Sequence, residues 1–305
     1  MLLQAAAAAA GEQQYPVAAL YMVATPIGNL ADLSLRAIHV LSLVDAVACE
    51  DTRVTGQLLR HLGLDKPMIA LHAHNEQGAS QTVLARLSAG QRVAYASDAG
   101  TPAVSDPGAA LVALIAQAGH RVLPIPGASS AVAAMSVAGD TGVQGFHFAG
   151  FLPAKGQERH AALQALLALP GSQILFEAPH RIESLMAALA LAAPQRSVTV
   201  CREMTKQFEA VNTMRAETAP AWLAADPNRL RGEFVLVIHA ATVIPRSAEE
   251  LSAPAQRTLT VLLRELPLKQ AVALTAELTD APRNVLYQHA LALRTAAAPD
   301  DAEDH

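Results

Sequence analysis

Residues 20–32 read LYMVATPIGNLAD, an apolar run that ends in a turn containing a proline and a glycine. The run has the length of a short buried strand, so we predict a strand over Leu20–Ala24. A glycine in the turn lets a ligand approach the backbone closely. The same turn also suits a plain connection between a strand and a helix, and this stretch alone leaves both interpretations open.

The first half of the chain repeats this order of a short apolar run and a helical pattern. The other predicted strands are Ala46–Cys49, Met68–Leu71, Arg92–Ala96 and Arg121–Ile125. Amphipathic stretches between them predict helices over Ser34–Leu43, Gln77–Leu87 and Gly108–Ala118. Such alternation is typical of a mostly parallel sheet wound with helices. We therefore predict an N-terminal α/β domain over residues 19–138, with a disordered tail over residues 1–18.

The pattern changes after Gly139–Gly145, a segment rich in glycine and polar residues. The strands predicted beyond it are Phe146–Phe148, Gln173–Glu177, Ser197–Glu203, Phe208–Met214 and Glu233–Ala240, with helices near Gly156–Leu169 and Arg181–Ala192. Because two of these strands follow each other without a helix, the second α/β domain, over residues 145–242, is expected to have a mixed or antiparallel sheet. Helical periodicity over residues 250–295 predicts a small C-terminal helical appendage with a helix-turn-helix-like pair.

The charge and cysteine content narrow the class of protein. The chain has 27 acidic and 22 basic side chains and a net charge of −5, whereas a protein that coats nucleic acid needs a broadly basic face. Its two cysteines, Cys49 and Cys201, lie in apolar runs and are expected in the core. No stretch of about eighteen apolar residues without charges occurs, so we predict a cytoplasmic protein without a membrane span.

Two long loops follow predicted strands at the edge where wound α/β sheets bind their ligands. They are Ser97–Gly108, which has aspartates in two turns, and Pro124–Ser130. The first is too long and too polar to serve only as a connector. Its aspartates, and Ser129 in the second loop, also suit helix capping, which is the alternative to ligand binding.

Together with these loops, several motifs in a fixed order resemble the tetrapyrrole-methylase superfamily of S-adenosylmethionine-dependent enzymes. Within it the chain is most similar to the ribosomal small-subunit RNA 2′-O-methyltransferase I family. The motifs are ATPIGNL (24–30), ACEDTR (48–53), LHAHNE (71–76), residues 97–108, GFLPAK (150–155) and REMTK (202–206), with ELPLK (265–269) and NVLY (284–287) in the tail. The first strand lacks a following Gly-x-Gly-x-Gly turn, which disfavours a Rossmann-type methyltransferase.

The resemblance implies a methyl donor, S-adenosyl-L-methionine, bound between the two α/β domains. It implies as acceptor the ribose of a cytidine in the decoding region of 16S rRNA, on the small ribosomal subunit. It also implies a homodimer. The residues implied to hold the donor are Pro26, Gly28, Ser97, Asp98, Gly100, Thr101, Pro102, Ser129, Ser130, Phe151, Leu152, Glu177, Met204 and Gly232.

Methyl transfer to a hydroxyl requires alignment of the oxygen, the methyl group and the sulfur, and removal of the hydroxyl proton. Asp106 is the preferred proton acceptor, and Glu177 is a weaker candidate. Alignment without a dedicated base is the alternative.

Basic side chains near the same motifs are candidates for phosphate contacts with RNA. They are Arg53, Lys155, Arg159, Arg181, Arg202 and Lys206. For the cluster around Lys155 and Arg159, a solvated helix face is the alternative. The pair His72 and His74 has no third ligand at a suitable spacing, and no metal is expected.

Two other functions remain open from the sequence. A related enzyme that methylates a corrin or another tetrapyrrole shares the donor-binding turns. A ribosome-binding module without catalytic activity is the alternative from another class. The C-terminal helices carry few lysines and arginines for an RNA-binding element, so their role is left open.

Overall fold

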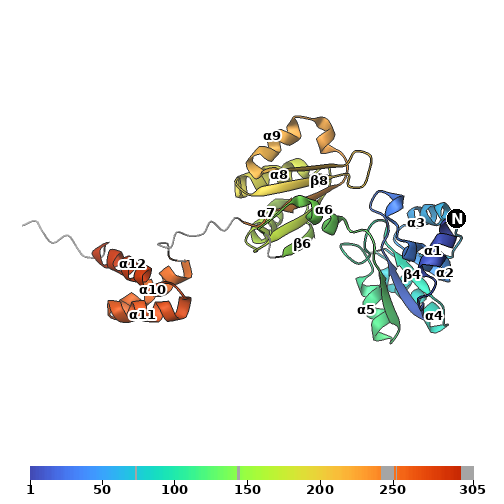
Figure 1. The fold of residues 1–305 in the computed structure, drawn as a ribbon, viewed down its shortest axis with the longest axis horizontal. Helices are drawn as coiled ribbons and strands as arrows, with labels where there is room; N and C mark the ends of the chain where they lie inside the picture. The colour runs from blue at the N-terminus through green and yellow to red at the C-terminus, as the bar shows by residue number, and fades with distance from the viewer. Residues whose placement is uncertain (73, 143–144, 242–250, 252, 297–305) are drawn as a thin grey trace, which may run out of the picture. The chain divides into compact units, whose positions relative to one another are not determined.

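The computed structural model describes residues 1–72, 74–142, 145–241, 251 and 253–296. The chain divides into two compact units, Met1–Ala241 and Thr242–His305 (Figure 1). The first unit contains two β-sheets, and the second contains helices. In the described part of the chain, no helix is long and apolar enough to cross a membrane.

The first sheet has five parallel strands in the order β3-β2-β4-β1-β5. They are β1 (Ala19–Val23), β2 (Ala46–Cys49), β3 (Met68–Ala70), β4 (Val93–Ala96) and β5 (Arg121–Ile125). The predicted wound parallel sheet is confirmed, and the predicted strands overlap the observed ones closely. Because all strands are parallel, the loops that follow them lie at one edge of the sheet.

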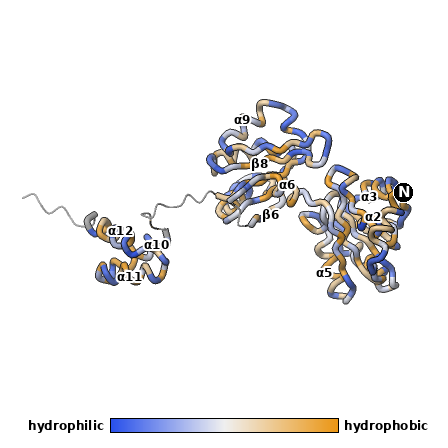
Figure 2. Tube along the Cα trace, in the orientation of Figure 1, coloured by the Kyte–Doolittle hydropathy of each residue, from blue (hydrophilic) through white to orange (hydrophobic). Residues whose placement is uncertain are grey.

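Helices cover both faces of this sheet. Successive side chains of a strand point to opposite faces, so Tyr21 packs with helices on one face and Leu20 with helices on the other. The helices are α2 (Leu35–Leu43) and α3 (Thr52–His61) on the first face, and α4 (Glu76–Ser88) and α5 (Ala109–Gln117) on the second. Figure 2 shows apolar residues along the strands, where each buried large side chain contributes about 1.5–3 kcal/mol.

The second sheet is mixed, as predicted, with the order β6-β7-β10-β8-β9. Its strands are β6 (Phe146–Phe151), β7 (Ser172–Glu177), β8 (Ser197–Arg202), β9 (Ala210–Arg215) and β10 (Phe234–Ile238). Strands β6 and β7 are parallel, and the other neighbours are antiparallel. One face packs against helices α7 (Gly156–Leu167), α8 (Ile182–Ala192) and α9 (Ala219–Ala224). Short 3-10 helices occupy Leu30–Asp32, Ala216–Thr218 and Pro227–Leu230.

Helix α6 (Ser130–Ala138) covers the opposite face of the second sheet. Its small residues Ala131, Ala134 and Ala138 are buried against side chains such as Cys201 and Val237. This helix falls within the predicted N-terminal domain, but its apolar stripe packs on the second sheet. The connection after β5 therefore carries the chain from one sheet to the other.

The prediction of a disordered tail over residues 1–18 is wrong. Leu2–Ala10 forms helix α1, in which Ala6 and Ala10 are buried, and Ala6 belongs to the same core as residues of α2. The Tyr15 hydroxyl donates to the carbonyl oxygen of Ala10 at 3.0 Å. Alanine has the highest helix propensity, and tertiary packing supplies the stability that a short isolated helix lacks.

The C-terminal unit contains helices α10 (Ala253–Glu265), α11 (Leu268–Thr279) and α12 (Arg283–Ala296). They enclose a core of their own that includes Leu259, Val272 and Leu286. Asp280, with φ of 53°, ends α11 in the left-handed conformation, which turns the chain toward α12. The predicted limits at residues 242 and 250 lie outside the described residues.

Candidate active site

A cavity of about 430 Å³ lies between loops of the first sheet and strands of the second, and we name it the intersheet cavity. Its size is in the range of small-molecule sites. The first sheet's loops and α6 contribute Ile27, Ala99, Gly100, Thr101, Val104, Asp106, Ser129, Ser130 and Ala131. The second sheet contributes Phe151, Phe176, Glu177, Ala178, Pro179, Cys201, Met204, Glu233, Phe234 and Val235.

Two glycines allow the two halves of the cavity to approach closely. A Cβ at Gly28 would lie 2.6 Å from Lys206 Cγ, and a Cβ at Gly150 would lie 2.7 Å from Ser105 Oγ. Gly150 also has φ of 62°, a conformation that costs other residues about 1–2 kcal/mol. The glycines of the turn after β1 and of strand β6 therefore permit contacts that a side chain would block.

The loop Ser97–Gly108 has a strained backbone. Ala103 and Ser105 have positive φ angles of 63° and 66°, although neither is a glycine. Left-handed backbone at ordinary residues is rare and concentrates at functional sites. The aspartates of this loop do not cap α5, whose N-cap residue is Gly108 without a side-chain hydrogen bond. The alternative that these aspartates serve as helix caps is therefore wrong.

Helix α6 begins in the wall of the cavity. Ser129 is its N-cap residue, but the Ser129 side chain makes no capping hydrogen bond. The first N–H groups of a helix have no partner within the helix, and the helix dipole makes this end attractive to anions. Ser129, Ser130 and Ala131 line the cavity at this point.

A group of carboxylates lies around the loop Ser97–Gly108. Burial raises the pKa of Asp106; a hydrogen bond with Ser97 opposes this rise, and the nearby Asp98 charge adds to it. Burial likewise raises the pKa of Asp98 and of Glu50. Asp106 lines the intersheet cavity, so the carboxylate whose pKa is raised faces this cavity.

Glu177 is held by two arginines and is fully buried as a side chain. Arg159 Nη2 lies 2.7 Å from Glu177 Oε2, and Arg181 Nε lies 3.0 Å from Glu177 Oε1. The N–H of Ala178 donates to Oε1 at 2.9 Å, and Arg181 Nη2 donates to the carbonyl oxygens of Leu152 and Pro153. With these partners, Glu177 fixes the cavity wall, and both of its oxygens are held within the protein.

Of the fourteen residues predicted to hold the donor, eleven line one of two cavities. Gly100, Thr101, Ser129, Ser130, Phe151, Glu177 and Met204 line the intersheet cavity. Pro26, Gly28, Ser97 and Asp98 line a second cavity of about 350 Å³. Pro102, Leu152 and Gly232 line neither cavity. Gly232 has φ of 92°, and its missing side chain makes room for Glu203.

We name the second cavity the α3 cavity because helix α3 forms one of its walls. Its lining consists of Thr25, Pro26, Gly28, Leu30, Val54, Thr55, Gln57, Leu58, His61, Ser97 and Asp98.

Most of the basic side chains predicted to contact RNA have partners within the protein. Arg159 and Arg181 hold Glu177, and Lys206 bonds to Glu203 and Glu233. Arg53 pairs with Asp51, whose pKa falls to about 2 because of the Arg53 hydrogen bonds; Arg202 donates to the carbonyl oxygens of Arg231 and Phe208. Lys155 is exposed and has no hydrogen bond or ion pair among the described residues. Of the predicted set, it alone has no side-chain partner among the described residues.

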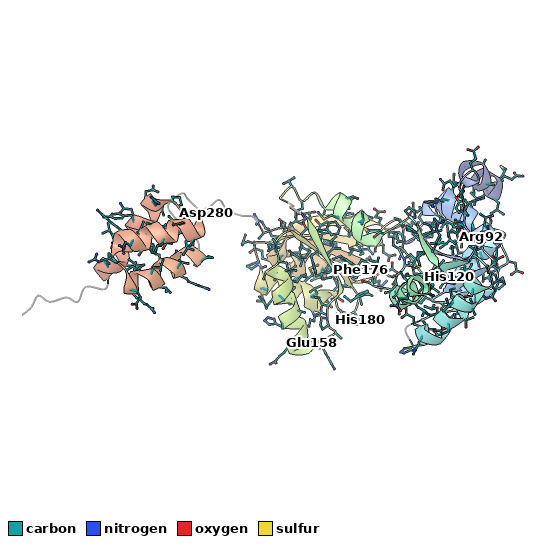
Figure 3. All side chains as sticks on the ribbon, turned by 90° about the horizontal axis from the view of Figure 1, so that it is seen from below. Arg92, His120, Glu158, Phe176, His180 and Asp280 are labelled. Carbon is teal, nitrogen blue, oxygen red and sulfur yellow. The ribbon has the colours of Figure 1, made fainter. Side chains whose placement is uncertain are left out.

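Other polar candidates do not join this site. Within the described residues, no group of three or more His, Cys, Asp or Glu side chains is placed to hold a metal ion. The rings of His72 and His74 lie 6.1 Å apart. His180, which Figure 3 labels together with Phe176, is exposed after β7. The Phe176 ring packs against Phe151 with ring centroids 5.6 Å apart. Cys49 and Cys201 are buried free thiols, as expected.

Several lining residues were not identified from the sequence. Phe176, Cys201 and Val235 belong to strands of the second sheet, and their apolar character predicts only a buried strand. Met204 was found through its motif. The contribution of α6 was suggested by the polar start of the helix at Ser129 and Ser130.

Two family profiles match the chain. The profile described as Tetrapyrrole (Corrin/Porphyrin) Methylases matches residues 19–220. The profile described as RsmI C-terminal HTH domain matches residues 249–294. Together they cover the first sheet, the second sheet except strand β10, and nearly all of the C-terminal helices.

Curated relatives are similar over most of the chain. A protein of Escherichia coli O157:H7 is 45% identical over 273 residues, covering 89% of this chain and 94% of the relative. A protein of Pseudomonas aeruginosa is 44% identical over 273 residues, which are 89% of this chain and 96% of the relative. One of Neisseria meningitidis serogroup A is 43% identical over 272 residues, covering 89% and 92%. All three are named ribosomal RNA small subunit methyltransferase I.

Solved structures share the fold at low sequence identity. Diphthine synthase superposes with a TM-score of 0.57 and 19% identity, covering 73% of this chain and 90% of that chain. Uroporphyrin-III C-methyl transferase from Thermus thermophilus, complexed with S-adenyl homocysteine, superposes with a TM-score of 0.51 and 16% identity. The match covers 72% of this chain and 96% of that chain.

Proposed function

Because the chain belongs to the tetrapyrrole methylase family and, within it, to the ribosomal RNA small subunit methyltransferase I proteins, we propose that it methylates small-subunit ribosomal RNA. The methyl donor is S-adenosylmethionine. The acceptor that we assign is the ribose 2′-hydroxyl of a cytidine in the decoding region of 16S rRNA. The support is identity of 45% over most of the chain to a relative with that name, together with a cavity suited to the donor.

The residues of the intersheet cavity fit the donor's chemistry. The rings of Phe151 and Phe176 and the side chain of Val235 offer apolar surface for an adenine. The uncapped start of α6 at Ser129 and Ser130 offers N–H groups for a carboxylate. The Asp106 carboxylate offers a negative charge to a sulfonium. When bound, S-adenosylmethionine supplies an activated methyl group on a positively charged sulfur.

The protein's own part in the reaction is alignment and proton removal. The two sheets hold the cavity walls in fixed positions through contacts such as that between Gly150 and Ser105. Asp106 is the proposed proton acceptor, because its raised pKa brings its proton affinity closer to that of a hydroxyl than an exposed aspartate's. Glu177 is not assigned this role, since Arg159 and Arg181 occupy its oxygens.

The chain's relation to tetrapyrrole methyltransferases does not favour a tetrapyrrole acceptor. The solved tetrapyrrole enzymes are 16–21% identical to this chain, which supports a shared fold. The match of residues 249–294 to the C-terminal domain profile instead supports the ribosomal acceptor. We further propose that the protein works in the cytoplasm and as a homodimer.

The test is methyl transfer from labelled S-adenosylmethionine to small ribosomal subunits that lack the modification, with mapping of the methylated nucleotide. We expect one 2′-O-methylcytidine in the decoding region of 16S rRNA. The variant Asp106→Asn should lower kcat at saturating donor about a hundredfold or more. Absence of methyl transfer to subunits and to free 16S rRNA would contradict the proposal. Normal turnover by Asp106→Asn would contradict the assignment of the base alone.

A further inference from the structure

The α3 cavity lies beside the intersheet cavity, and one short loop contributes to both. Ser97 and Asp98 line the α3 cavity, and the residues 99–101 that follow them line the intersheet cavity. The two are separated where Thr25 and Gly100 pair: the N–H of Thr25 donates to the Gly100 carbonyl at 2.9 Å, and the N–H of Gly100 donates to the Thr25 carbonyl at 3.0 Å. A ligand in the α3 cavity is thus one loop away from the donor.

One face of helix α3 forms the wall of the α3 cavity. Val54, Gln57, Leu58 and His61 follow the i, i+3, i+4, i+7 spacing that places side chains on one side of a helix. Val54 and Leu58 offer apolar surface to a flat ring, and His61 is an exposed aromatic side chain of the kind on which RNA bases stack. This wall suits a planar heterocycle of small size.

Asp98 supplies a directional polar group in the same cavity. Its Oδ1 accepts a hydrogen bond from the N–H of Asp51 at 3.0 Å, which fixes the carboxylate. Its Oδ2 has no hydrogen-bond partner among the described residues. A carboxylate is an acceptor only, so it favours a ligand that presents an amino group and disfavours one that presents a carbonyl oxygen.

We propose that the α3 cavity takes the unstacked base of the acceptor nucleotide, and that Asp98 selects a base with an exocyclic amino group. This inference rests on the proposed function. Cytosine presents such an amino group at the position where uracil presents a carbonyl oxygen. The cavity of about 350 Å³ is in the range of ligand sites, and enzymes that modify nucleotides commonly take the target base out of its stack.

The first experiment measures base selection at equilibrium. Decoding-region RNA oligonucleotides, in which each cytidine in turn is replaced by uridine, compete for the protein in the presence of S-adenosylhomocysteine. We expect one replacement to weaken binding about tenfold or more. In Asp98→Asn, whose amide also donates hydrogen bonds, this preference should shrink to within a few-fold. Equal binding of all replacements, or an unchanged preference in Asp98→Asn, would overturn the proposal.

The second experiment fills the cavity without changing charge. Val54 is 42% exposed in the α3 cavity, and Val54→Phe should raise the RNA Kd about tenfold while leaving the S-adenosylmethionine Kd within twofold of the wild type. The matched control is Val17→Phe, because Val17 is 56% exposed and precedes the amino end of β1, away from the turns. A parallel rise of both Kd values in Val54→Phe, or an unchanged RNA Kd, would overturn the proposal.

These binding measurements separate the two proposals. A protein that selects cytidine but transfers no methyl group to RNA would retain the base cavity and contradict the proposed function. A protein that methylates 16S rRNA but binds the cytidine and uridine oligonucleotides equally would retain the proposed function and contradict the base cavity.

Discussion

Glu177 carries a buried negative charge that Arg159 and Arg181 neutralise. The arginine side chains are only 12% and 18% exposed, so removing their counter-charge leaves two guanidinium groups in a poorly hydrated place. We predict that Glu177→Gln lowers the free energy of unfolding by about 3–5 kcal/mol, measured by urea denaturation at neutral pH. Glu158→Gln, at an exposed position near the start of α7, should cost about 0.5 kcal/mol. Equal losses in the two variants would contradict the structural role of Glu177.

Asp106 should make the protein less stable at neutral pH. Because burial raises its folded-state pKa, the folded protein binds more protons than the unfolded chain between the two pKa values. Stability therefore falls as pH rises through this interval. We predict that Asp106→Asn raises the thermal midpoint at pH 7, and that the gain disappears below about pH 4, where the unfolded aspartate is protonated.

The control for this prediction is Asp65→Asn, at an exposed position without a hydrogen bond among the described residues. It should leave the thermal midpoint nearly unchanged at pH 7. Thermal unfolding of both variants at several pH values checks the prediction. A lower midpoint of Asp106→Asn at pH 7 would mean that the carboxylate stabilises the fold.

Strand β6 and the loop Ser97–Gly108 meet at Gly150. We predict that Gly150→Ala raises the Kd of S-adenosylmethionine, measured by calorimetry, about tenfold, because the new Cβ would push Ser105 from its place. Gly63→Ala is the matched control: Gly63 also has a left-handed φ, of 71°, but nothing lies within 4 Å of its Cβ position. Both variants place a side chain in left-handed backbone, which costs about 1–2 kcal/mol, and only Gly150→Ala should lose donor affinity. The same donor affinity in both would contradict this role for the contact.

The sequence predicts the strands of both sheets because most are short apolar runs bounded by turn residues, whereas β9 alternates half-buried and exposed residues. It does not predict α1, whose alanines show no amphipathic pattern and are ordered by packing in which Ala6 is buried. Nor does it predict helix α3, for which a capping Asp51 is the clearest signal, with its side chain accepting from the N–H of Arg53. Helix α1 is stabilised mainly by tertiary contacts and leaves a weak local pattern, whereas α3 carries local helix signals in its cap and its amphipathic spacing.

In the candidate site, too, the sequence predicts residues with local motifs but not contacts between distant elements. The motifs identify Thr101, Ser129 and Asp106 as residues near one ligand, and all three line the intersheet cavity. The pairing of Arg159 with Glu177 joins residues 18 positions apart on different elements, and no local pattern reveals it. The left-handed backbone of Ala103 is also hidden, because no glycine marks the position.

At the scale of the whole molecule, Met1–Ala241 and Thr242–His305 have separate cores. We predict that Leu259→Ala, at a fully buried position in α10, destabilises the C-terminal helices by about 2–5 kcal/mol. The Kd of S-adenosylmethionine should stay unchanged, because all residues that line the intersheet cavity lie within Met1–Ala241.

The matched control is Leu274→Ala, since Leu274 lies in α11 and is 41% exposed. It should cost well under 2 kcal/mol. Thermal unfolding and calorimetric donor titration of both variants check the prediction. A weaker donor affinity in Leu259→Ala would show that the two units depend on each other for donor binding.

The pair formed by Thr25 and Gly100 joins its two loops through main-chain N–H and C=O groups. These bonds are made by main-chain groups and need only that Gly100, with φ of 83°, stay a glycine. Mutations that alter the lining of the α3 cavity can therefore accumulate while the Thr25–Gly100 pair and the intersheet cavity persist. A fold built in this way can acquire new acceptors during evolution without rebuilding the place where its methyl donor binds.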